Sequence, residues 1–169
     1  MVMDQLWAPW RLSYVTTNKV PLEALPCFIC QGLAEEDDRR NLIIWRTPLS
    51  VALLNKFPYN NGHLLVSPRA HKGRLDDLSH SEMTETMETV RTLVRTLDDL
   101  IHPDGYNIGI NLGSAAGAGL PGHLHWHIVP RWNGDTNFMP ILTDTKVIVQ
   151  SLDTLYSLLT ERLRESRTS

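Results

Sequence analysis

The chain has 169 residues, and its content of 42% hydrophobic and 21% charged residues is typical of one globular domain with a single core. Its formal net charge of −3 and the lack of a basic tract exclude nucleic-acid polymers as partners. With no apolar run of about 18 residues and no secretion signal at its start, we expect a cytoplasmic protein that does not span a membrane.

Taken in chain order, the sequence predicts an irregular start followed by a β-meander. Residues 1–40 combine prolines, tryptophans and an acidic patch, and we expect them to be irregular, with residues 1–24 as an arm outside a core over about residues 25–135. Short β-prone runs follow, and turn residues separate them. These predicted strands are Leu42–Arg46, Leu49–Leu54 and Gly62–Ser67.

A long amphipathic helix is predicted next. Ser79 and Glu82 form a capping box, and after it apolar residues recur at spacings of four and three until Pro103. Strands over residues 106–112 and 123–129 and a C-terminal helix over about residues 151–165 complete the pattern. Hairpin-length connections between the first strands favour one α+β domain over residues 1–169, with a largely antiparallel sheet covered by helices.

The last predicted strand carries the most informative pattern, in which His123, His125 and His127 alternate with large apolar residues. Side chains alternate between the two faces of a strand, so the three imidazoles should share one face while Leu124 and Trp126 face the core. Imidazole can act as a nucleophile, an acid, a base or a metal ligand. The central His125 is the best-placed nucleophile, because its attack on phosphorus gives a phosphoramidate while His127 donates to a phosphate oxygen or to the leaving group.

A glycine-rich loop over residues 111–122 comes just before the histidines and favours a phosphate ligand, because successive amide N–H groups can turn toward one anion. Two other interpretations of the three histidines stay open at this point. They can bind a catalytic zinc ion with one open position. They can also be core histidines, each with a buried partner.

Cys27 and Cys30 are the only cysteines and have the CxxC spacing, which both zinc sites and dithiol redox sites use. No thioredoxin-like βαβ pattern follows them, and this favours zinc. Two imidazoles would complete a closed tetrahedral site. The candidates are His63, His71, His80, His102 and one end of the histidine row.

The run His123–Val129 fits the pattern His-φ-His-φ-His-φ-φ, in which φ is apolar, and the chain here resembles the histidine triad family. The similarity covers about residues 40–135, including Asn55–Pro58, Gly62–Val66 and the glycine-rich loop. The resemblance implies an α+β homodimer whose five-stranded antiparallel sheets join across the interface. It also implies that the protein hydrolyses or transfers nucleoside monophosphates through a histidine-linked intermediate.

Within this family, the chain looks most like bacterial diadenosine tetraphosphate phosphorylases and related hydrolases. The stretches that carry this likeness are Leu6–Arg11, Gly109–Gly113 and Pro130–Phe138. By resemblance, His125 is the nucleophile, His127 and His63 contact the phosphate, and Asn55 binds the ribose.

The resemblance also implies a structural zinc ion, because some relatives hold zinc with a CxxC pair, a later histidine and the first histidine of the motif. In this chain those ligands are Cys27, Cys30, His71 and His123, and a zinc-bound His123 would orient its neighbours instead of reacting. Many relatives also have a side-chain donor just before the motif, where this chain has Ala118–Gly122. The substitutes we expect are Ser114 or the backbone N–H groups of Gly117 and Gly119, and we also expect Asn111 to bind the substrate.

We therefore expect an enzyme, a nucleotidyl hydrolase or transferase that cleaves dinucleoside polyphosphates, such as diadenosine tetraphosphate, or related nucleoside phosphate conjugates. The alternative is a nucleotide-binding interaction module without significant turnover.

Overall fold

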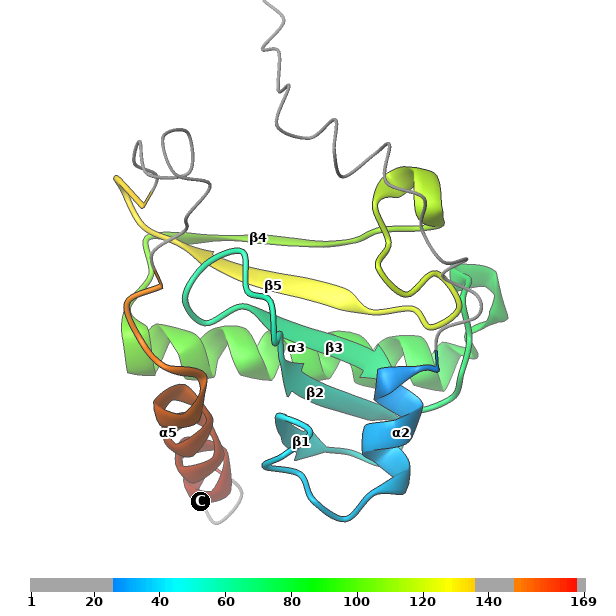
Figure 1. Ribbon diagram of the computed structural model, residues 1–169, viewed down its shortest axis with the longest axis horizontal. Helices are drawn as coiled ribbons and strands as arrows, with labels where there is room; N and C mark the ends of the chain where they lie inside the picture. The colour runs from blue at the N-terminus through cyan, green and yellow to red at the C-terminus, as the bar shows by residue number, and fades with distance from the viewer. Residues whose placement is uncertain (1–25, 136–147, 167–169) are drawn as a thin grey trace, which may run out of the picture.

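A computed structural model describes residues 26–135 and 148–166, which form a five-stranded antiparallel sheet with helices on both faces (Figure 1). The predicted arm over residues 1–24, the stretch Leu6–Arg11 and the end of Pro130–Phe138 lie outside these residues. The strand order is β1-β2-β3-β5-β4. The elements are α2 (Phe28–Ala34), β1 (Ile43–Arg46), β2 (Ser50–Leu54), β3 (Leu64–Pro68), α3 (His80–Ile101), β4 (Gly105–Ile110), β5 (Trp126–Arg131) and α5 (Leu152–Glu165). The predicted α+β fold is confirmed.

One face of the sheet packs against α3 and α5 and holds the larger core (Figure 1). Leu124, Trp126 and Ile128 point into this core as predicted, and each is at most 7% exposed. Burying a side chain of this size stabilises the fold by about 1.5–3 kcal/mol. In the part of the chain that the structure describes, none of the helices has both the length and the apolar surface needed to cross a bilayer.

Helix α3 begins and ends where the sequence predicts. The Ser79 hydroxyl accepts a hydrogen bond from the Glu82 backbone N–H at 3.2 Å, and the Glu82 carboxylate accepts one from the Ser79 N–H at 2.7 Å. The helix ends at His102, which has the left-handed conformation with φ of 43° and lies just before Pro103. These local signals are sufficient to define the helix.

The expectation that residues 1–40 are irregular is wrong at α2, which covers part of the opposite face of the sheet. Its Ile29 is fully buried against residues of β1, β2 and β3. The Cys27 sulfur accepts a hydrogen bond from the Cys30 N–H at the start of the helix, at 3.4 Å. At its end, the Arg46 guanidinium of β1 donates to the carbonyls of Gly32, Leu33 and Glu35. A helix of seven residues depends on such tertiary partners, and they are not apparent from local periodicity.

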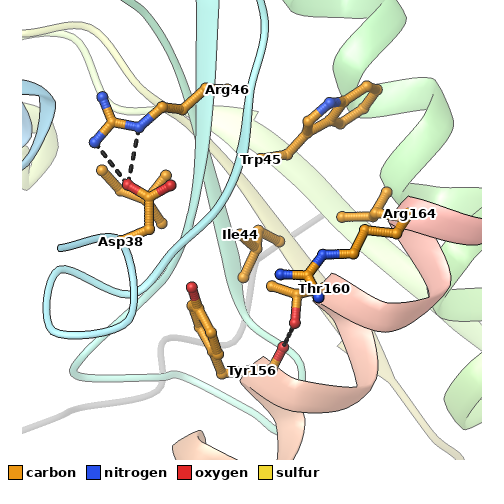
Figure 2. A pocket seen from close by; sticks show the side chains of 9 residues that line it. Asp38, Ile44, Trp45, Arg46, Tyr156, Thr160 and Arg164 are labelled. Carbon is orange, nitrogen blue, oxygen red and sulfur yellow. Dashed lines mark hydrogen bonds and ion pairs between the residues drawn. The ribbon is translucent and has the colours of Figure 1, made fainter. Parts of the chain in front are cut away.

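Helix α5 packs beside β1, and the two elements line a cavity of about 270 Å³ (Figure 2). Figure 2 shows Arg46 paired with Asp38 on one side of this cavity, while Tyr156, Thr160 and Arg164 of α5 lie on the other. The Arg39 guanidinium lies over the Tyr156 ring, 5.2 Å from its centroid, and pairs with Asp153. These contacts attach α5 to the β1 side of the sheet.

The strand predicted over residues 123–129 starts later, at Trp126, and continues to Arg131. The backbone before it is held by loops instead of by the neighbouring strands. The Leu124 N–H donates to the Lys72 carbonyl at 2.7 Å, and the Leu124 carbonyl accepts from the Ser67 hydroxyl at 2.7 Å. His123 and His125 therefore lie just outside the ladder, whereas His127 lies within it, opposite Leu65 of β3 and Gly109 of β4.

Candidate active site and metal site

Four side chains from three separate segments converge at the start of α2. They are Cys27, Cys30, His71 and His123, and one ligand atom from each lies within 4.8 Å of all the others. The Cys27 sulfur is 3.1 Å from His123 Nδ1, and the Cys30 sulfur is 3.3 Å from His71 Nδ1. In tetrahedral zinc sites, bond lengths of about 2.3 Å to sulfur and 2.0–2.1 Å to nitrogen place such S and N atoms about 3.5 Å apart. These four residues can therefore hold a metal ion.

The second nitrogen of His123 supports the same interpretation. His123 Nε2 donates to the Pro68 carbonyl at 2.8 Å, so its Nδ1 keeps a lone pair directed at the two sulfurs. Burial and the neighbouring Cys27 sulfur raise the pKa of the Cys30 thiol to about 11. A reactive redox cysteine has a lowered pKa, and Cys30 does not have this property.

The segment that carries His71 is fixed to the start of α3. Lys72 follows His71, and its ammonium contacts both carboxylate oxygens of Glu82 at 2.8 and 3.0 Å. This ion pair, together with the Ser79 N–H, lowers the pKa of Glu82 to about 2. Helix α3 therefore holds the loop of His71 in place beside His123.

Only the first histidine of the row belongs to this cluster. Among the described residues, His125 and His127 are not part of a metal-binding group, which argues against the interpretation that the row as a whole binds a catalytic metal ion. His125 is 7% exposed, and its Nδ1–H donates to the His123 carbonyl at 2.8 Å. The Nε2 atom of His125 is then the unprotonated nitrogen, with the free lone pair that a nucleophile requires.

A chain of hydrogen bonds gives His127 the opposite arrangement. The Tyr59 backbone N–H donates to His63 Nδ1 at 2.9 Å, and a backbone amide can only donate. His63 therefore carries its proton on Nε2, which donates to His127 Nδ1 at 2.9 Å. His127 then carries its own proton on Nε2 and can donate it.

The electrostatic environment keeps both rings neutral near pH 7. Burial lowers the pKa of His127 to about 4, and the nearby His125 adds to this shift. Burial also lowers the pKa of His125, although its bond to the His123 carbonyl acts in the opposite direction. The two ring centroids lie 5.1 Å apart. The site thus places a neutral nucleophilic nitrogen beside a neutral N–H donor.

Asn55 lies next to these histidines, and Asn111 lies at the end of β4, the strand that pairs with β5. Asn55 Nδ2 is 3.2 Å from His63 Nδ1, and its Oδ1 accepts from the Phe57 N–H. Asn111 directly follows β4, whose last residue, Ile110, is paired with Trp126. Because the two strands are antiparallel, Asn111 comes at the register position next to His125.

Within the loop, Ser114, Gly117 and Gly119 are exposed. The Gly117 N–H donates to the Ser114 carbonyl at 3.0 Å, so it is already used inside the loop. Of the predicted donors in this loop, the Ser114 hydroxyl and the Gly119 N–H fit a substrate phosphate better.

Sequence reasoning missed Tyr59. Its ring stacks on His127 with centroids 5.7 Å apart and an interplanar angle of 19°, and it lies 4.6 Å from the centroid of His63. The main contribution of Tyr59 is a backbone N–H, which every residue except proline has, so no residue pattern could have indicated it.

Comparison with known proteins gives a consistent picture. The HIT domain profile matches residues 36–134. The AP-4-A phosphorylase of Mycobacterium tuberculosis is 38% identical over 168 residues, which cover 96% of this chain and 86% of that protein. The asymmetrical bis(5'-nucleosyl)-tetraphosphatase of Schizosaccharomyces pombe is 39% identical over 93 residues, or 55% of this chain and 50% of that protein.

A solved structure has the same fold. It is a zinc-bound histidine triad family protein from Mycobacterium smegmatis, with a TM-score of 0.66 and 25% identity, and the match covers 84% of this chain and 96% of that chain. The histidine row, the fold and the extent of the profile match lead to one conclusion: the chain belongs to the HIT domain family of histidine triad proteins.

Proposed function

We propose that this protein is a nucleotidyl hydrolase or transferase that cleaves dinucleoside polyphosphates, such as diadenosine tetraphosphate, through a nucleotidyl intermediate on His125. The observation that carries the proposal is the opposite tautomers of His125 and His127, which place a lone pair and an N–H side by side. The relatives named as a phosphorylase and a tetraphosphatase support the same substrate class.

The reaction takes two displacements at phosphorus. In the first, His125 Nε2 attacks the α-phosphorus, and the P–O bond to the leaving nucleoside polyphosphate breaks. The leaving oxygen departs as an anion that accepts a hydrogen bond from His127 Nε2–H, which keeps its proton. In the second, an oxygen of water or inorganic phosphate attacks the same phosphorus, and any proton that this oxygen carries stays on a phosphate oxygen of the product. The N–P bond then breaks and His125 returns to its starting form.

His63 has a supporting role in this proposal. Both of its ring nitrogens face partners within the protein, Tyr59 and His127, and its side chain is 1% exposed. We therefore assign His63 to the positioning of His127 instead of to direct contact with the phosphate. Asn55, Asn111, Ser114 and Gly119 remain the proposed contacts to the ribose and phosphate.

We also propose that the Cys27, Cys30, His71 and His123 cluster holds a structural zinc ion. Four protein ligands leave no open position for substrate, so the metal would supply a cross-link and no chemistry of its own. This cross-link would fix His123, whose carbonyl accepts the Nδ1–H of His125. Two unpaired cysteines acting as ligands fit a reducing compartment, and we place the protein in the cytoplasm on this basis.

Product analysis tests the proposed activity. Purified protein is incubated with diadenosine tetraphosphate, with and without inorganic phosphate, and the nucleotides are separated by anion exchange. AMP and ATP indicate hydrolysis, and ADP and ATP indicate phosphorolysis. The His125→Asn variant should lose at least about a thousandfold in kcat, because no covalent intermediate can form. Unchanged turnover in this variant, or an adduct trapped on another residue, would refute the mechanism, and binding without products would indicate a binding module.

Metal analysis tests the zinc site. Protein purified without chelators should contain about one zinc ion per chain, and the Cys27→Ser variant should contain much less and melt at a lower temperature. Circular dichroism of the variant reports whether the sheet stays folded. Full metal content in the variant would contradict this ligand set.

A further inference from the structure

The loop between β2 and β3 exposes an aromatic pair that neither the metal cluster nor the proposed mechanism uses in full. Phe57 is 77% exposed and Tyr59 is 53% exposed, which is unusual for side chains of this size. Lys56 precedes them and is also exposed. Within the described ranges, the Lys56 ammonium has no ion-pair partner. A cation and two aromatic rings are the groups that bind a phosphate chain and a nucleobase.

This loop lies beside the histidines. In Figure 1 the β2–β3 loop crosses in front of β5, and the stacking of Tyr59 on His127 shows that the two segments are in contact. Asn55 Oδ1 accepts from the Phe57 N–H at 2.9 Å, and Asn55 Nδ2 reaches the ring of His63. Hydrogen bonds therefore fix the loop to the same residues that orient His127.

The contacts between the rings indicate on which side of His127 the leaving group lies. His125 lies 5.1 Å from His127, and His127 lies 5.1 Å from His63 and 5.7 Å from Tyr59. The ring of His127 thus contacts both the nucleophile and Tyr59. In an in-line displacement the leaving group departs on the side away from the nucleophile. A leaving group that accepts a hydrogen bond from His127, on the side away from His125, would then approach Tyr59.

We propose that Lys56, Phe57 and Tyr59 form the subsite for the leaving nucleoside polyphosphate. Its base stacks on the exposed faces of Phe57 and Tyr59, and Lys56 attracts its phosphates. The subsite selects substrates with a nucleoside at both ends over those with a small leaving group. This inference rests on the proposed function, because it requires that His127 donates a hydrogen bond to a leaving nucleotide.

Two substrates that share a transferred AMP group separate the subsite from the chemistry. Diadenosine tetraphosphate has a leaving nucleotide, whereas adenosine 5'-phosphoramidate releases only ammonia. The Phe57→Ala variant should raise KM for diadenosine tetraphosphate about tenfold, because one stacking contact is lost, and leave KM for the phosphoramidate unchanged. The Lys56→Gln variant should act in the same direction, with an effect that shrinks at high salt.

Leu158→Ala is the matched control, because Leu158 is a 37% exposed apolar residue on α5, away from the histidines, and neither KM should change.

ATP binding supplies a readout that needs no turnover. ATP is titrated by calorimetry in the presence of saturating AMP, which occupies the nucleoside site beside His125. Phe57→Ala should weaken this ATP binding about tenfold.

The outcomes keep the two proposals apart. If the wild-type protein turns over neither substrate, the proposed function fails. If Phe57→Ala changes KM equally for both substrates, or changes neither KM nor ATP binding, the subsite is wrong while the function stands. Tyr59→Leu should also lower kcat for both substrates, because it removes the ring that stacks on His127.

Discussion

At the scale of single residues, hydrogen-bond partners make three identical side chains different. His123 turns its Nδ1 to two sulfurs, His125 gives its Nδ1 proton to a carbonyl, and His127 accepts at Nδ1 from His63. The sequence places these rings two residues apart but does not show the proton on any of them. The tautomers follow from backbone groups of other segments, which explains why the pattern predicted the site and the structure was needed to divide its roles.

The half-buried His127 makes stability depend on pH. Its folded pKa of about 4 lies below the ordinary value of 6.5, so the unfolded chain takes up a proton first as the pH falls. The folded protein therefore loses stability between about pH 6.5 and 4, and not above this window. The wild type should lose more free energy of unfolding than His127→Gln when the pH is lowered from 7.5 to 5, as measured by urea denaturation.

His123 and His125 are present in both proteins, so the comparison isolates the contribution of His127. Circular dichroism at both pH values verifies that each protein starts from a folded state. A parallel decline in the two proteins would mean that His127 is not kept neutral by burial.

At the scale of elements, the sequence predicted the helices and strands whose ends are marked by capping or turn residues. Helix α3 has a capping box and a long apolar period, and the first three strands are bounded by turn residues. Helix α2 was missed because its ends are satisfied by a cysteine and by Arg46 from β1, and its only fully buried apolar residue is Ile29. The start of β5 was placed too early because Leu124 bonds to loops through both backbone groups. In both cases, hydrogen bonds between segments far apart in the sequence set the bounds of the element.

Arg46 holds α2, and with it the two cysteines. Its guanidinium donates to three carbonyls at the end of the helix and pairs with Asp38. Arg46→Met should leave those carbonyls unpaired, lower the free energy of unfolding by about 2 kcal/mol and weaken metal retention. Chemical denaturation measures the first effect, and competition with a chelator measures the second.

Arg40→Met is the matched control, because Arg40 is exposed and close in sequence. It should change neither quantity by much. If Arg46→Met retained its metal as tightly as the wild type, the cysteines would be positioned without the capped end of α2.

At the scale of the whole molecule, the two edges of the sheet differ. The β1 edge lies beside α5, whereas β4 is the opposite edge strand and is largely exposed (Figure 1). Ile108 in the middle of β4 is 45% exposed. An open edge with an exposed apolar side chain favours pairing with another strand. We propose that two copies of the chain pair through β4 and form a homodimer.

The oligomeric state should respond to a charge on that edge. Ile108→Glu places two carboxylates close together in a paired edge and should convert the dimer to a monomer, which light scattering after size exclusion detects. Leu158→Glu, on the exposed side of α5, should leave the mass unchanged. A monomeric wild type, or a dimer that tolerates Ile108→Glu, would place the contact elsewhere or remove it.

The amide of Tyr59 has a consequence for how this site tolerates substitution. The proton arrangement of His63 and His127 begins at a backbone group, so replacing the Tyr59 side chain leaves the first donor in place. A Tyr59→Ala variant would lose the ring but would keep the backbone N–H that donates to His63. Substituting the side chain at this position therefore changes the ring contacts of His127 but keeps the tautomers of His63 and His127, and proline is the one substitution that would remove the ring and the donor at once.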